Sequence, residues 1–98
     1  MYVIRKYTLQ VGSGVTDITL PCGVSYPRIL SVQYQESNHA PQVWVALQAG
    51  NTGCTYRFHT FATGEEIPDR VILYCDYVGT YQYWNGRRVY HVYSERVI

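Results

Sequence analysis

The sequence contains few charged residues. Aspartate, glutamate, lysine and arginine make up 15% of its 98 residues, whereas an average globular protein has about 25%. The formal net charge at neutral pH is only +1. A chain so close to neutrality exerts no strong long-range attraction on a phosphate backbone or an anionic membrane surface. We therefore expect no strong binding of long nucleic acids and no membrane partner.

The sequence also lacks any long hydrophobic run. No apolar stretch approaches the roughly 20 residues that a helix needs to cross a bilayer. The first residues, Met1 to Tyr7, alternate between polar and apolar side chains and contain no signal-peptide apolar segment. These two features predict an intracellular protein.

Cysteine is scarce, and its positions show no pairing pattern. Cys22, Cys54 and Cys75 form no C-x-x-C pair. An odd number of cysteines in a chain without a secretion signal predicts free thiols. Cys75 lies among apolar and aromatic residues, so we expect it in the core. Cys22 lies in Pro21-Cys22-Gly23, which we expect to be a turn that ends a strand.

The patterns typical of catalytic and metal sites are missing as well. There is no G-x-S-x-G nucleophile elbow and no phosphate-binding loop. The histidines and cysteines show no metal-ligand spacing, and the adjacent acids Glu65 and Glu66 are typical of a solvated loop. We expect no catalytic residues, no metal and no cofactor, and a protein that is not an enzyme. A small nucleotide-processing enzyme that uses His59 or His91 is the weaker alternative.

The sequence does contain repeated β-type alternation. Short segments of alternating apolar and polar residues are separated by glycine, proline and asparagine. Strands are expected over residues 3–11, 15–20, 28–36, 43–48, 54–62, 77–84 and 87–94, with 29–32 buried. Residues 63–69 show no alternation, and we expect them to form a surface loop that includes one helical turn. The sequence therefore predicts an all-β fold, a compact antiparallel barrel or sandwich of about six to seven strands in a single domain over residues 1–98.

The strongest local signal is Asn85-Gly86, between the last two expected strands. A two-residue Asn-Gly connection is typical of a type I′ β-hairpin, because both residues tolerate positive φ. The turn sets the register of the C-terminal hairpin, with Tyr83 opposite Arg88 and Val78 opposite Tyr93. Gly79 then predicts either a bulge or the close approach of a neighbouring segment.

Several short motifs occur along most of the chain in a fixed order. They are Lys6-Tyr7-Thr8-Leu9, Leu20-Pro21-Cys22-Gly23, Ile29-Leu30-Ser31-Val32-Gln33, Trp44-Val45-Ala46-Leu47, Arg57-Phe58, Thr63-Gly64, Tyr77-Val78-Gly79-Thr80 and Val89-Tyr90-His91-Val92. In this order the chain resembles a family of small β proteins of unknown function from phages and prophage-bearing bacteria. The resemblance implies a phage setting and a compact β fold, but no chemistry, so no functional residue is carried over from it.

Aromatic residues are abundant, with 11 tyrosines, two tryptophans and two phenylalanines. Tyrosine favours β-sheets and is also enriched at interfaces. Arginine beside aromatic rings can stack on bases, bind phosphates or form a protein–protein hot spot. The predicted ligand- or partner-binding residues are Tyr81, Tyr83, Trp84, Arg87, Arg88 and Tyr90. The alternative is that Trp84 and Arg87 form a cross-strand pair that only stabilises the hairpin.

These observations predict a phage-encoded binding protein that acts in the host cytoplasm. The expected role is a counter-defence inhibitor that blocks a bacterial immune effector or sequesters its nucleotide signal. The expected partner is therefore a host immune protein or a small nucleotide ligand. The alternative is a virion or assembly accessory whose tyrosine-rich surface forms a homo-oligomer.

Overall fold

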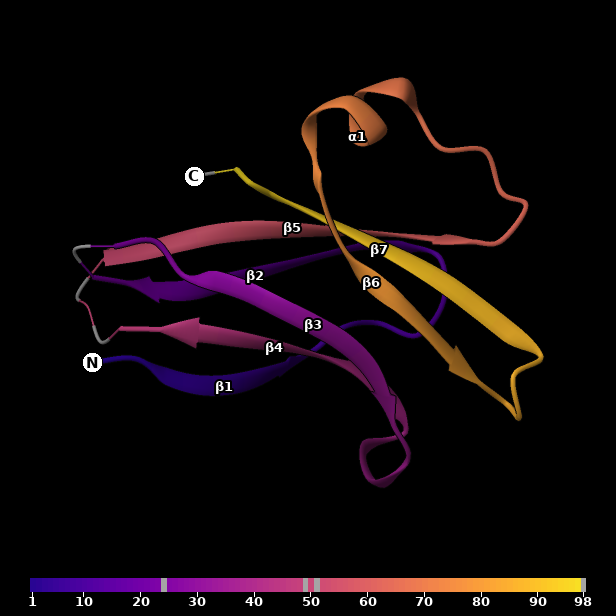
Figure 1. The fold of residues 1–98 in the computed structure, drawn as a ribbon, viewed down its shortest axis with the longest axis horizontal. Coiled ribbons are helices and arrows are strands. Elements are labelled where there is room, and N and C mark those ends of the chain that lie inside the picture. Colours follow the sequence, from indigo (N-terminus) through magenta and orange to yellow (C-terminus); the bar gives the residue numbers. More distant parts are fainter. Residues whose placement is uncertain (24, 49, 51, 98) are drawn as a thin grey trace.

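The computed structural model describes residues 1–23, 25–48, 50 and 52–97, which form two antiparallel sheets (Figure 1). One sheet has the order β1-β4-β3 and is formed by β1 (Val3–Thr8), β3 (Arg28–Gln35) and β4 (Ala40–Leu47). The other has the order β2-β5-β7-β6 and is formed by β2 (Gly14–Cys22), β5 (Thr52–Ala62), β6 (Asp76–Tyr83) and β7 (Arg88–Arg96). The predicted all-β antiparallel fold is confirmed, and the two separate sheets make it a sandwich.

The core lies between the two sheets. Strand β5 shows the period of two that a half-buried strand requires, since Tyr56, Phe58 and Thr60 are buried while the residues between them are partly exposed. In the opposite sheet, Val43 and Val45 of β4 are fully buried. Both inner faces are mostly apolar, so each sheet removes the apolar face of the other from water.

The prediction that residues 29–32 are buried is wrong in the middle of the segment. The register between β3 and β4 shifts between Ile29 and Ser31. A bulge adds one residue to one strand, which turns the following side chains to the other face. Leu30 and Ser31 are therefore exposed, whereas Val32 is buried.

The register predicted for the C-terminal hairpin is confirmed from Tyr83 opposite Arg88 down to Gly79 opposite Val92. Asn85 and Gly86 have φ values of 54° and 77°, and the Arg87 N–H donates to the Trp84 carbonyl at 3.1 Å. Both central residues of the turn, Asn85 and Gly86, therefore have the positive φ that a type I′ turn requires. The ladder itself ends at Tyr83 and Arg88, because Trp84 also has a positive φ, of 58°.

Both consequences predicted for Gly79 are found. The register shifts between Tyr77 and Gly79, so Tyr77 pairs with Tyr93, and the predicted pairing of Val78 with Tyr93 is wrong. A Cβ atom at Gly79 would lie 3.2 Å from the Cγ1 atom of Val32 in β3. Gly79 thus allows β6 to pack closely against the other sheet at the point where the bulge bends it.

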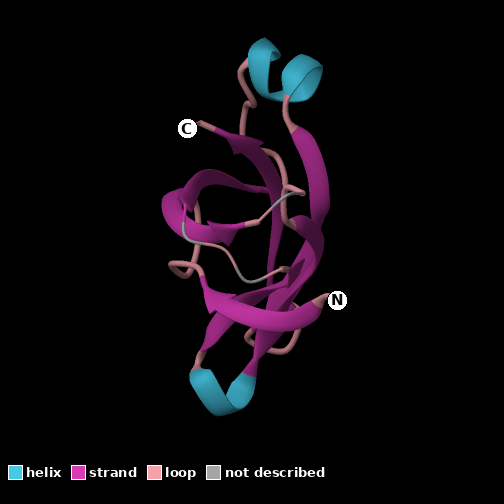
Figure 2. Ribbon diagram, turned by 90° about the vertical axis from the view of Figure 1, so that its left-hand side faces the viewer, coloured by secondary structure: helices cyan, strands magenta, loops and turns pink. Residues whose placement is uncertain are grey.

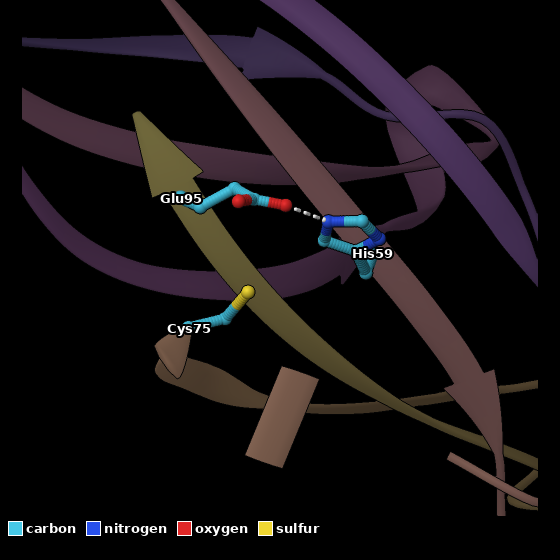
Figure 3. A group of neighbouring side chains, drawn as sticks. All are labelled: His59, Cys75 and Glu95. Atoms are coloured by element: carbon cyan, nitrogen blue, oxygen red, sulfur yellow. Dashed lines mark hydrogen bonds and ion pairs between the residues drawn. The ribbon is translucent and has the colours of Figure 1, made fainter. Parts of the chain in front are cut away.

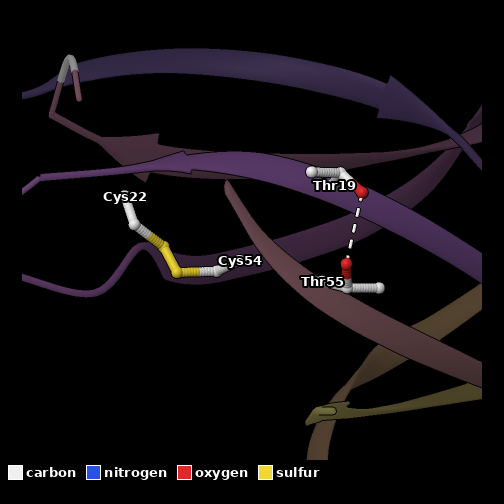
Figure 4. Close-up of a disulfide and its surroundings, with 4 residues drawn as sticks. All are labelled: Thr19, Cys22, Cys54 and Thr55. Atoms are coloured by element: carbon white, nitrogen blue, oxygen red, sulfur yellow. Dashed lines mark hydrogen bonds between the residues drawn. A yellow bond between two sulfur atoms is a disulfide. The ribbon is translucent and has the colours of Figure 1, made fainter. Parts of the chain in front are cut away.

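The prediction of three free thiols is wrong, because Cys22 and Cys54 form a disulfide (Figure 4). Strand β2 does not end before Pro21 but continues to Cys22, and its pairing with β5 places Cys54 opposite Leu20. The Cα atoms of the two cysteines are 5.8 Å apart, within the usual range for a disulfide. Both cysteines are buried. Cys75 is the free cysteine among the described residues, and it is half-buried instead of lying in the core.

Two short helices lie at opposite ends of the molecule (Figure 2). One is η1 (Glu36–Asn38), a 3-10 turn between β3 and β4. The other is α1 (Asp69–Tyr74), which follows the predicted loop and is held by Val71, its one buried residue. The helical turn expected within residues 63–69 does not form inside that loop, and the helix begins only at Asp69. Within the described ranges, neither helix has the length and apolar character needed to cross a bilayer.

Candidate functional site

The end of the C-terminal hairpin presents an exposed tryptophan between two arginines. The side chain of Trp84 is 56% exposed. The guanidinium carbons of Arg87 and Arg88 lie 5.6 and 5.3 Å from the centroid of the Trp84 ring. Both distances are within the range of cation–π attraction. Trp84 and Arg87 are therefore in contact, and Arg88 makes the same kind of contact with the Trp84 ring.

Two tyrosines form the base of this surface. Tyr83 and Tyr90 are half-buried, and their rings stack with centroids 5.9 Å apart. Tyr34 of β3 stacks on Tyr83 at 5.0 Å, which ties the hairpin to the other sheet. Burial raises the pKa of Tyr90, and the hydrogen bond with Tyr83 raises it further. These rings support the hairpin end and expose only part of their area.

Tyr81 does not belong to the predicted binding surface. Its side chain is 2% exposed and lies in the core. The Gly12 N–H donates to the Tyr81 hydroxyl at 3.2 Å. Burial raises the pKa of Tyr81 to about 12. Alternation along the strand could not show this, because Tyr81 and Tyr83 lie on the same face of β6 but are covered to different extents.

We call the remaining predicted surface the hairpin tip, defined by Tyr83, Trp84, Arg87, Arg88 and Tyr90. A hollow of about 170 Å³ lies beside it, lined by Ala62, Thr63, Arg87, Arg88, Val89 and Tyr90. Pockets for small organic ligands are usually about 300–1,000 Å³. The hairpin tip is thus better suited to fit against the surface of a larger molecule than to enclose a nucleotide.

His91, next to Tyr90 in sequence, has a structural role beside the hairpin tip. His91 is bonded on both ring nitrogens, by Nδ1 to the Thr80 hydroxyl at 2.9 Å and by Nε2 to the Thr63 hydroxyl at 2.6 Å. His91 and Thr80 lie opposite each other in the ladder of β6 and β7, so their hydrogen bond is a cross-strand interaction. His91 therefore links β6, β7 and the loop after β5, and both nitrogens are engaged in that structural role.

A second cluster of polar side chains was missed by the sequence analysis. His59 of β5, Cys75 after α1 and Glu95 of β7 point toward one another (Figure 3). His59 Nε2 and Glu95 Oε2 lie 2.6 Å apart, and Arg70 donates to Glu95 Oε1 at 2.9 Å. The Arg70 and His59 hydrogen bonds lower the pKa of Glu95. Spacing rules could not find this cluster, because the three residues come from three separate elements.

This cluster does not have the geometry of a thiol hydrolase. Such a site needs one imidazole nitrogen toward the thiol and the other toward the carboxylate. In Figure 3 the His59 nitrogen that is bonded to Glu95 is also the nitrogen nearer to Cys75, and the second nitrogen points away. Burial raises the pKa of the Cys75 thiol, which disfavours the thiolate nucleophile.

Helix α1 carries a further exposed apolar surface that the sequence analysis missed. We call it the helix patch, defined by Ile72, Leu73 and Tyr74 of α1 and by Tyr77 of the following strand β6, which are 53–79% exposed. Scattered exposed apolar residues are normal, whereas several large ones exposed on adjoining elements can serve as an interaction site. The signal in the sequence was Val71-Ile72-Leu73-Tyr74, which a six-residue helix cannot bury on all sides.

Comparison with known proteins gives one match. A family model described as "Domain of unknown function (DUF7352)" matches residues 1–97. No curated protein and no solved structure matches the chain.

Proposed function

The chain belongs to the family described as Domain of unknown function (DUF7352), and since that description names no activity, we propose from the geometry that it is a non-enzymatic binding protein. The observation that carries this proposal is the exposed Trp84 ring between Arg87 and Arg88. Tryptophan and arginine are the residues most enriched in binding hot spots. An exposed indole at the end of a hairpin contributes little to the core, so a partner surface explains its position better than folding does.

We further propose a protein as the partner. The hairpin tip projects from one end of β6 and β7 (Figure 1), and the hollow beside it is about 170 Å³. A projecting aromatic and arginine surface can insert into a groove of another protein, where loss of water strengthens the cation–π contacts. Within a phage setting, the proposed target is a bacterial immune effector. Sequestration of that effector's nucleotide signal is the alternative at the same surface.

The test is a comparison of binding by the chain and by a triple variant, Trp84→Ala/Arg87→Ala/Arg88→Ala. The chain would first be expressed in hosts that carry different immune systems, and phage plating would identify the effector that it blocks. Binding to that purified effector should then weaken at least about 100-fold in the triple variant, since single hot-spot residues commonly contribute 2 kcal/mol or more. Circular dichroism should show an unchanged fold, because all three side chains are exposed.

A matched control is available elsewhere on the surface. Arg96 lies 3.8 Å from the centroid of the exposed Tyr26 ring. The variant Tyr26→Ala/Arg96→Ala removes the same kind of pair and should leave binding within about twofold, as expected for residues outside a hot spot. Full binding by the triple variant would refute the site. Binding of a nucleotide signal by the chain, without contact to the effector, would favour the alternative.

The helix patch favours a second candidate function, a virion or assembly accessory that forms a homo-oligomer. Its four large apolar side chains are exposed in the single chain, and self-association would remove them from water. In that case sedimentation should give a mass that is a multiple of 11.3 kDa. Leu73→Asp should convert the oligomer to a monomer. Leu30→Asp changes an exposed leucine of β3 and should leave the oligomer intact. A monomer at about 100 μM, a concentration at which even micromolar dimers form, would contradict this function.

The proposed place of action is the host cytoplasm. The Cys22–Cys54 disulfide bears on this proposal, because disulfides are rare in reducing compartments. A counter-defence protein made and used in the cytoplasm would have to fold and act with this pair reduced.

A further inference from the structure

We propose that His59, Cys75 and Glu95 form a zinc-binding site. Each residue offers one ligand atom, and these atoms lie within 4.8 Å of one another. The three side chains converge from β5, from the residue after α1 and from β7 (Figure 3). Zinc is bound in proteins by histidine nitrogen, cysteine sulfur and carboxylate oxygen, which is the donor set present here. The site is separate from the hairpin tip and does not depend on the proposed function.

The present spacing requires only side-chain adjustment to admit an ion. In a tetrahedral site with zinc–nitrogen and zinc–oxygen distances of about 2.0–2.1 Å, the two ligand atoms lie about 3.3 Å apart. His59 Nε2 and Glu95 Oε2 are now 2.6 Å apart and must separate slightly. The Cys75 sulfur already lies within 4.8 Å of the other ligand atoms, and rotation about χ1 of Cys75 can adjust its position. Nε2 of His59, the nitrogen that is bonded to Glu95, is the one suited to coordination.

Arg70 is positioned to orient one of the ligands. It donates to Glu95 Oε1 at 2.9 Å and lies farther from Oε2, at 3.4 Å. Coordination through Oε2 would leave the shorter Arg70 bond intact. A hydrogen-bonded partner of this kind fixes the direction of a metal-binding carboxylate. Two anionic ligands, a thiolate and a carboxylate, would also neutralise the charge of the zinc ion beside the guanidinium.

The site would have an open position for a fourth ligand. A hollow of about 270 Å³ borders His59 and Arg70, with Val15, Phe61 and Pro68 among the residues that line it. Both His59 and Glu95 are mostly but not completely buried. The hollow reaches the site at His59, and a water molecule can complete a tetrahedral site of three protein ligands.

Bound zinc would attach α1 to the sheet. Helix α1 is held to β7 by the bond between Arg70 and Glu95 and to the sandwich by the burial of Val71. A metal bond from Cys75 to β5 and β7 would hold the end of α1 at a second point. Because α1 carries the helix patch, zinc would order that surface for a partner.

The test measures Co²⁺ as a spectroscopic substitute for Zn²⁺ in the intact, oxidised chain. One Co²⁺ per chain should bind and produce the intense near-ultraviolet absorption of a cobalt–thiolate bond, and Zn²⁺ should displace it. Cys75→Ser should abolish that absorption. His59→Gln and Glu95→Gln should each weaken Co²⁺ binding at least about tenfold, since loss of even a hydrogen-bonded partner of a ligand costs about 10–100-fold. His91→Gln is the matched control, because His91 lies outside the cluster. This variant should bind Co²⁺ as tightly as the unsubstituted chain does.

A second measurement needs no substitution and so cannot fail through misfolding. Zn²⁺ should slow the alkylation of Cys75 by iodoacetamide at least about tenfold, since a metal-bound thiolate is protected from reagents. Removing the ion with a chelator should restore the rate. Equal alkylation rates with and without Zn²⁺, or Co²⁺ uptake with no thiolate absorption, would overturn the proposal.

Discussion

Removal of the Cys22–Cys54 disulfide is expected to lower the free energy of unfolding by about 3–4 kcal/mol. The two cysteines are 32 residues apart in sequence, and an open loop of that length gives the unfolded chain many more conformations. The change to make is Cys22→Ala/Cys54→Ala, which leaves no unpaired thiol at the site. Urea unfolding at neutral pH measures the difference, and the slope against urea concentration shows whether the unfolded state has expanded.

The control for this prediction is the effect of a reducing agent. Reduction should destabilise the natural chain by a similar amount and should leave the double variant unchanged. Equal unfolding midpoints for the oxidised and reduced natural chain would contradict the expectation. The oxidation state of the pair in host cells, read by thiol alkylation and mass spectrometry, bears on the proposed compartment. A fully oxidised pair there would argue against action in a reducing cytoplasm.

Phe58→Ala is expected to destabilise the protein by about 3–5 kcal/mol, the range for loss of a buried phenylalanine. Phe58 is 1% exposed and lies in the core cluster between the two sheets. The substitution removes its burial energy and leaves a cavity, because strands held by two ladders cannot collapse fully into the space. Strand β5 pairs with both β2 and β7, so it is held in this way. Urea unfolding with a circular dichroism signal measures the loss.

Phe61 is the matched control for Phe58, since it lies on the same strand but on the opposite face. It is half-buried and makes an edge contact with Tyr93, with ring centroids 6.3 Å apart. Phe61→Ala should lower the free energy of unfolding by less than half as much as Phe58→Ala does. The reason is that it removes less buried apolar area and opens no cavity. Equal losses for the two variants would mean that the sandwich core does not lie on the Phe58 face.

The parts of the structure that could be predicted from sequence are those set by local geometry. Alternation with a period of two is a property of one strand, and it located all seven strands to within a few residues. The Asn85-Gly86 turn allows few registers, so the pairing from Tyr83 to Gly79 could be predicted without the rest of the chain. The hairpin tip is also local, since Trp84, Arg87 and Arg88 are neighbours in sequence.

The features that could not be predicted all depend on how distant elements meet. The burial of Tyr81 depends on the coverage of its strand face by the other sheet, which its own strand does not encode. The disulfide depends on the pairing of β2 with β5, and spacing alone cannot specify a partner for Cys22. The cluster of His59, Cys75 and Glu95 forms only where β5, α1 and β7 converge.

By itself, then, the sequence determined an antiparallel β domain with a defined last hairpin and an aromatic and arginine surface at its turn. Only the tertiary structure decided which tyrosines are buried, which cysteines are joined, and that a second polar cluster exists below α1. The physical reason is the separation along the chain over which each kind of interaction acts. Backbone preferences and turn geometry act over a few residues, whereas burial, disulfide pairing and ligand clusters require contacts between residues far apart in the chain.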